Sequence, residues 1–159
     1  MPLTDVRIDE ALWQAATAER RREWRQIVHD LLADHRFGDG VPQRLTIRLV
    51  GGDTVLEAAP DAGGPSLRLT LPLGTMMPHF QGYFAICRDM SAARPPAPAP
   101  RLEALDIAKR LSHDEAADVL LALCEPLGVD HPTCRRLFTL LLCLHFDTST
   151  LLVAHHRGH

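Results

Sequence analysis

An apolar run near the C-terminal end of the chain, residues 137–144, constrains the fold more than any other feature. Thr139 is the one polar residue within it, and Asp130 and Pro132 precede it as residues suited to the N-cap and first turn of a helix. A helix that is apolar on nearly all sides must be covered on nearly all sides. The run is too short for a membrane span, which needs about 20 apolar residues. It therefore predicts a central C-terminal helix and no membrane partner.

Several stretches of the first half alternate apolar and polar residues, as half-buried strands do. They are residues 5–9, 45–49, 54–58 and 67–73, and the glycine pairs 51–52 and 63–64 lie between the last three. Glycine-rich turns of this kind join neighbouring antiparallel strands. We therefore expect a small antiparallel sheet of three to four strands with one apolar face, which helices must cover.

The remaining segments are predicted to be helical. The expected helices cover residues 11–35, a short segment beginning at Pro78, residues 102–111, residues 112–123 and the C-terminal run. Ser112 and Glu115 match a capping box, which predicts that a separate helix begins there. The fold class is accordingly α+β, with the sheet packed against four to five helices and the C-terminal helix central.

Length and composition fit a single domain over residues 1–159. Residues 94–101 are rich in proline, which favours an extended connector between an N-terminal half of helix and strands and a C-terminal helical half. The tail from Thr148 is expected to be a weak strand or a disordered end.

Charge and cysteine usage exclude some partners. The formal net charge of −3 removes the broad attraction that drives most nucleic-acid binding, so no nucleic-acid partner is expected. The exception would be one patch that joins arginines 20–25 with Arg7, Arg44 and Arg48. The four cysteines lack paired short spacings, and no apolar leader follows the start, so we expect a cytoplasmic protein with reduced thiols.

Three segments of the second half share a pattern with a known family. They are Tyr-Phe-Ala-Ile-Cys at 83–87, the stretch 105–115 with its Lys-Arg-Leu-Ser-His-Asp-Glu sequence, and Asp-His-Pro-Thr-Cys-Arg-Arg-Leu-Phe-Thr-Leu at 130–140. The chain resembles uncharacterised protein family 0262, a family of small bacterial proteins with no assigned activity. Two glycines of the family pattern are replaced here by Leu111 and Ala116. The resemblance therefore implies kinship without chemistry.

His113 and Glu115 are the candidate catalytic residues in these segments. A histidine beside acidic residues can exchange a proton near neutral pH. The alternative is that Glu115 caps a helix and His113 makes a local hydrogen bond.

The candidate anion-binding residues are Arg110, Arg135, Arg136 and Tyr83. Arginine forks suit carboxylate and phosphate groups, and the first turn of a helix also favours an anion. Asp106 precedes Arg110 by four residues, however, which is the favourable order for an ion pair within a helix. Structural pairing of these arginines is therefore the competing interpretation.

No metal and no cofactor is expected. His131 and Cys134 have a usable ligand spacing, but zinc needs three or four ligands and no second pair follows. The histidines at 155–159 form a terminal tail, which suits adventitious binding. The chain also lacks a nucleophile elbow and a phosphate-binding loop.

Two functional hypotheses from different classes follow. The missing catalytic signatures favour a non-enzymatic cytosolic binding or regulatory module that acts through a protein partner or a small ligand, with homo-oligomer formation left open. The alternative is an enzyme or sensor for a small anionic metabolite, which would use the arginines and histidine of the C-terminal helices.

Overall fold

The computed structural model describes residues 3–93, 98–149 and 151. In chain order its elements are β1 (Leu3–Ile8), α1 (Glu10–Ala15), α2 (Ala18–Ala33), β2 (Gln43–Val50), β3 (Asp53–Pro60), β4 (Leu67–Leu71), α3 (Leu73–Ala92), α4 (Ala99–Leu123), the short 3-10 helix η1 (Glu125–Leu127) and α5 (His131–His145). The fold class is α+β, as the sequence predicts.

The four strands form one sheet in the order β1-β2-β3-β4. The pairings of β2 with β3 and of β3 with β4 are antiparallel, in agreement with the glycine turns. The first strand differs from the prediction, because β1 pairs with β2 in parallel and the sheet is mixed. Parallel neighbours need a long connection, and α1 and α2 supply it between β1 and β2.

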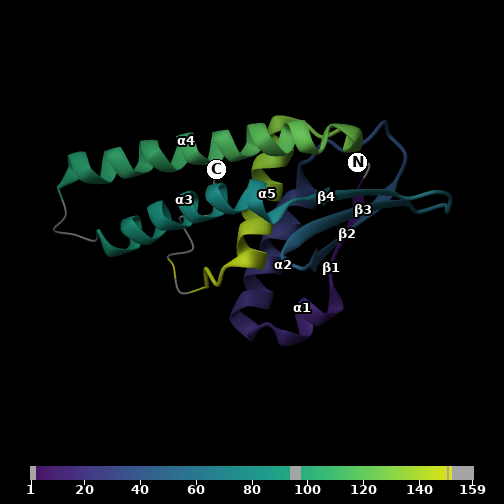
Figure 1. Cartoon of the computed structure of the whole chain (residues 1–159), viewed down its shortest axis with the longest axis horizontal. Coiled ribbons are helices and arrows are strands. Elements are labelled where there is room, and N and C mark those ends of the chain that lie inside the picture. The colour runs from purple at the N-terminus through teal and green to yellow at the C-terminus, as the bar shows by residue number, and fades with distance from the viewer. Residues whose placement is uncertain (1–2, 94–97, 150, 152–159) are drawn as a thin grey trace.

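The helix α5 lies at the centre of the molecule, as its apolar run predicts. Every residue from 137 to 144 is buried. Both α2 and α4 pack against α5, and the Trp24 indole of α2 donates a hydrogen bond to the carbonyl oxygen of Cys143 at 3.1 Å. Figure 1 shows α5 with the strands on one side and the far ends of α3 and α4 on the other.

The prediction of one helix over residues 11–35 is wrong. The structure has two helices, α1 and α2, which are separated at Ala16 and Thr17. The Thr17 hydroxyl accepts a hydrogen bond from the backbone N–H of Arg20 at 3.2 Å, which caps the start of α2. A threonine side chain at this position satisfies a donor that the helix itself leaves unpaired.

The prediction of a helix start at Ser112 is also wrong, since α4 runs unbroken through Ser112 and Glu115. His113 and Ala116 are buried on its inner face, and burial of that face favours a continuous helix over a local cap.

The short helix expected from Pro78 begins earlier, at Leu73. The carboxylate of Asp53 accepts the Leu73 backbone N–H at 2.7 Å, so a residue of β3 caps α3. Of the predicted connector, residues 94–97 lie outside the described part, and α4 already begins at Ala99.

The helices α3 and α4 lie side by side, and their far ends project beyond α5 (Figure 1). We call this projection the arm; it consists of residues 84–92 of α3 and 99–111 of α4. Among the described helices, none combines the length and apolar character that crossing a bilayer requires. Most of the predicted tail, residues 150 and 152–159, lies outside the described residues.

Glu23 of α2 makes stability pH-dependent. Burial raises its pKa above the ordinary 4.5, although Thr148 donates a hydrogen bond to its carboxylate. The folded state therefore holds a proton that the unfolded state loses, so stability should fall as pH rises from 4.5 through the raised pKa. Denaturant titrations across this window should show a shallower fall for Glu23→Gln. Parallel curves for the two proteins would contradict this assignment.

Candidate functional site at the junction of three helices

Two of the segments that carry the family pattern meet where α3 and α4 pack against α5. Tyr83 and Cys87 are four residues apart on α3, and Lys109 and His113 are four residues apart on α4. Residues at this spacing share one face of a helix. All four side chains are buried, with at most 2% of any residue exposed. We call these four residues the junction cluster.

Direct contacts tie the junction cluster to α5. The rings of Tyr83 and His113 lie 5.1 Å apart, and each lies 5.6 Å from the ring of Phe138. The Nε2 of His113 is 2.8 Å from the carbonyl oxygen of Arg135 and 3.2 Å from the Thr139 hydroxyl. A carbonyl only accepts, so Nε2 carries the proton and donates to Arg135.

Burial also determines the charge states of the cluster. It raises the pKa of the Cys87 thiol to about 11 and raises the pKa of Tyr83, whose side chain is hydrogen-bonded to Cys87. It lowers the pKa of the Lys109 ammonium, which lies in the field of Cys87. Each shift favours the neutral form of its group, because the charged form loses its hydration. The thiol at the junction is therefore protonated at neutral pH and a poor nucleophile.

The structure places the predicted site residues in several locations. Tyr83 and His113 meet in the junction cluster, whereas Glu115 is exposed on another face of α4. Arg135 contributes its backbone carbonyl to His113, and its guanidinium pairs with Asp114.

The other two arginines have carboxylate partners of their own. Arg110 pairs with Asp106 at 3.0 Å on the surface of α4, as the four-residue spacing predicts. Arg136 pairs with Asp34 at 3.1 Å. The three guanidinium groups thus engage three different carboxylates, and their role in binding an anion stays a prediction.

Sequence reasoning missed Cys87 and Lys109 as members of the site. Lys109 is the single lysine of the chain, and a lone lysine on a helix usually indicates a solvated surface. The available signal was the matched spacing of four residues in both segments, which places each pair on one helix face.

The cysteines and histidines give no metal centre within the described residues, where no group of three or more potential ligands occurs. Cys134 is buried, while His131 lies 3.1 Å from Asp118. The histidine tail lies outside the described residues.

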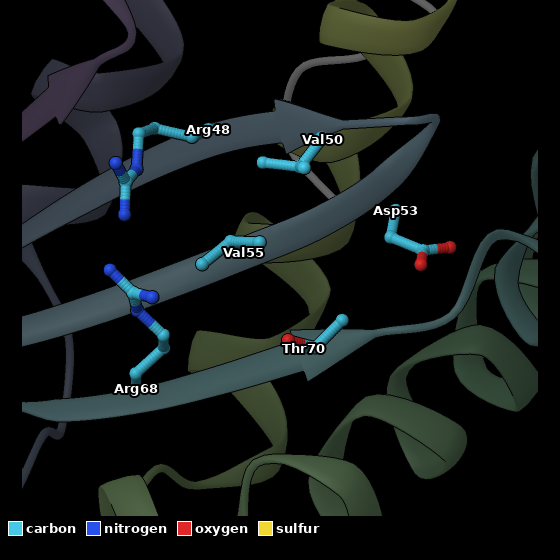
Figure 2. Close-up of a pocket in the computed structure, with 6 residues that line it drawn as sticks. All are labelled: Arg48, Val50, Asp53, Val55, Arg68 and Thr70. Atoms are coloured by element: carbon cyan, nitrogen blue, oxygen red, sulfur yellow. The ribbon is translucent and has the colours of Figure 1, made fainter.

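A second polar feature is a groove on the outer face of the sheet, with a volume of about 330 Å³. Its lining residues come from β2, β3 and β4 and are Arg48, Val50, Asp53, Val55, Arg68 and Thr70. Figure 2 shows the guanidinium groups of Arg48 and Arg68 pointing toward one another. Both pair with the carboxylate of Glu57, at 3.8 and 3.2 Å.

The fold and the site define a small α+β protein in which the helices α3, α4 and α5 meet at the buried side chains of the junction cluster. The chain belongs to the uncharacterised protein family UPF0262, which it matches over residues 1–147. Leu111 is exposed on the arm, and Ala116 is fully buried.

Relatives in bacteria are similar over nearly their whole length. A UPF0262 protein of Sphingopyxis alaskensis is 34% identical over 154 residues, which cover 90% of this chain and 92% of the relative. UPF0262 proteins of Novosphingobium aromaticivorans and Rhodospirillum rubrum are 32% and 34% identical, over 90% of this chain and 95% and 91% of the respective relatives. No solved structure matches the chain.

The buried thiols lead to a labelling prediction. Burial raises the pKa of Cys124 and Cys134 to about 12 and the pKa of Cys143 well above its ordinary value. These three thiols are therefore protonated at neutral pH, like the thiol of Cys87. Ellman's reagent should therefore modify the native protein only at the rate of local opening, and all four thiols rapidly in denaturant. Fast labelling of any thiol in the native protein would show that it is accessible and activated.

Proposed function

We propose that this protein is a non-enzymatic cytoplasmic binding module that acts through a protein partner, and that the outer face of α4 on the arm is its docking surface. The observation that carries the proposal is a pair of exposed apolar residues one turn apart. Ile107 is 51% exposed and Leu111 is 58% exposed. Exposed apolar residues grouped on one element are typical of interaction sites.

The spacing along α4 extends this pair into a stripe. Pro100, Ala104, Ile107 and Leu111 follow one another at intervals of four, three and four residues, and all are exposed. This is the spacing of the contact positions in paired helices. The buried residues of α4 lie on its opposite face, where α3 and α5 pack. We call these four residues the α4 stripe.

The junction cluster supports the same proposal from the interior. Its side chains are at most 2% exposed, so a solute reaches them only through a local opening of the helices. A hydrogen bond and ring contacts join the cluster to α5 at the base of the arm. A polar network of this kind holds helices in one relative arrangement when its members are satisfied.

A photo-crosslinking amino acid placed at Ile107, and separately at Leu111, tests the docking surface in living cells. Val50 is the matched control, because it is apolar and 57% exposed but lies on the outer face of the sheet. We expect a protein adduct at both arm positions and none at Val50. Absence of adducts from the arm, or equal yield at Val50, would contradict the proposal.

A second candidate function is a sensor for a small anion. The groove of Figure 2 is the candidate site for this anion, in place of the three arginines predicted from the sequence. Two guanidinium groups share the carboxylate of Glu57, and the other carboxylate of the lining, Asp53, accepts the backbone N–H of Leu73. Planar forks suit a carboxylate or phosphate guest.

A thermal-shift titration with inorganic phosphate and with citrate tests this second function. A ligand at 100 times its dissociation constant adds about 2.7 kcal/mol to stability. The wild type should then melt several degrees higher, and Arg68→Ala should lose the shift. Equal behaviour of both proteins would reject the groove as the site.

A further inference from the structure

We infer that the occupant of the α4 stripe is a second copy of this chain, bound with the two α4 helices antiparallel about a two-fold axis that passes between Ile107 and Leu111. The inference rests on the proposed function and names its partner. A two-fold interface uses the same patch on both copies, so one surface is sufficient to close the assembly.

The direction of pairing follows from the sequence of the stripe. Continued toward the C-terminal end of α4 at the same spacing, the stripe reaches Asp114 and Asp118. We call the stripe and its continuation the seam. Its N-terminal part, up to Leu111, is apolar, and its C-terminal part, from Asp114, is acidic. Asp114 is paired with Arg135 of its own chain, whereas the Asp118 side chain is 70% exposed beside His131. A parallel, in-register pair would place Asp118 against Asp118 of the other copy, and opposed like charges are destabilising.

An antiparallel pair avoids this repulsion. With the axis midway between Ile107 and Leu111, each Ile107 faces the other copy's Leu111, and the apolar centre is continuous. Asp118 then lies near Pro100 of the other copy rather than against a second aspartate. The helix dipoles also oppose one another in this arrangement, which is favourable.

Charges beside the seam agree with the same direction. Arg101 and Glu115 occupy equivalent flanking positions, and both are exposed. The antiparallel alignment brings Arg101 of each copy near Glu115 of the other, so the two-fold axis creates two opposite-charge pairs. Complementary flanking charges set partner choice and orientation in paired helices.

The size of the contact sets the expected strength. From Pro100 to Asp118 the helix is about 28 Å long, at about 1.5 Å per residue. One helix pair of this length gives an interface at the small end of the range for specific complexes. We therefore expect a dimer that dissociates on dilution, and not a permanent one.

Sedimentation equilibrium over a range of concentrations tests the inference. Wild type should approach the mass of two chains at high concentration, and Leu111→Lys should remain a monomer. Because Leu111 is 58% exposed, this variant should match the melting temperature of the wild type at low concentration, where both proteins are monomers, and this match serves as the folding control. A wild type that is monomeric throughout would overturn the inference.

Charge exchange tests the direction independently of the apolar substitution. Arg101→Glu and Glu115→Arg should each weaken the dimer several-fold, and the double variant should restore wild-type affinity. Failure of the double variant to recover would overturn the antiparallel arrangement.

The mass of the crosslinked adduct at Ile107 separates this inference from the proposed function. An adduct of two chains supports both statements. An adduct of another mass overturns the second copy and keeps the docking surface, while no adduct rejects both.

Discussion

Replacing Phe138 with alanine should lower the free energy of unfolding by about 3–5 kcal/mol, the range for a large aromatic side chain removed from a core. Phe138 is fully buried on α5. Its ring stacks on Phe80 at 5.4 Å and meets the edge of Tyr83 at 5.6 Å. The substitution therefore leaves a cavity at the point where three helices meet. Guanidinium denaturation followed by circular dichroism measures the loss.

The matched control is Leu111→Ala, which removes an apolar side chain of the arm that is 58% exposed. Its effect should stay within about 0.5 kcal/mol, as for an ordinary surface substitution. Measured on monomeric protein at low concentration, the two variants separate core packing from the docking surface. A loss below about 1 kcal/mol for Phe138→Ala would mean that the junction is not packed as described.

His113→Ala should cost about 2–4 kcal/mol, because it removes a buried ring together with its hydrogen bonds. The Nε2–H donates to the carbonyl of Arg135 at 2.8 Å, and the Thr139 hydroxyl lies 3.2 Å from the same nitrogen. Loss of the ring also removes a contact with Tyr83. Denaturant titration at neutral pH measures the change.

Glu115→Ala provides the control from the same helix. Glu115 is exposed, and at low concentration, where the protein is monomeric, its replacement should change stability by no more than about 0.5 kcal/mol. A His113→Ala protein as stable as the wild type would show that the junction cluster does not hold the helices together.

The sequence predicted those parts of the fold that one periodic pattern controls. The run at 137–144 indicated a central helix, and the glycine turns indicated the antiparallel strands. The parallel pairing of β1 was missed, because it depends on a crossover through two helices. The break at Thr17 was missed because a single hydroxyl cap competes there with a long apolar periodicity.

The candidate site was predictable only where contacts are local. The Asp106–Arg110 pair lies within one helix and follows from spacing alone. The partners of Arg136 and His113 lie on other elements, and only tertiary packing brings them together. Lys109 was missed for the same reason, since its burial depends on α3 and α5 and not on its own helix.

Hydrogen exchange measured at low and high protein concentration tests the central claim most directly, that the α4 stripe is the contact surface of this protein. We expect peptides from residues 100–118 to gain protection as concentration rises, while peptides from β2 to β4 stay unchanged. Protection that rises on the outer face of the sheet, with residues 100–118 unchanged, would contradict the account and move the contact surface to the groove of Arg48 and Arg68.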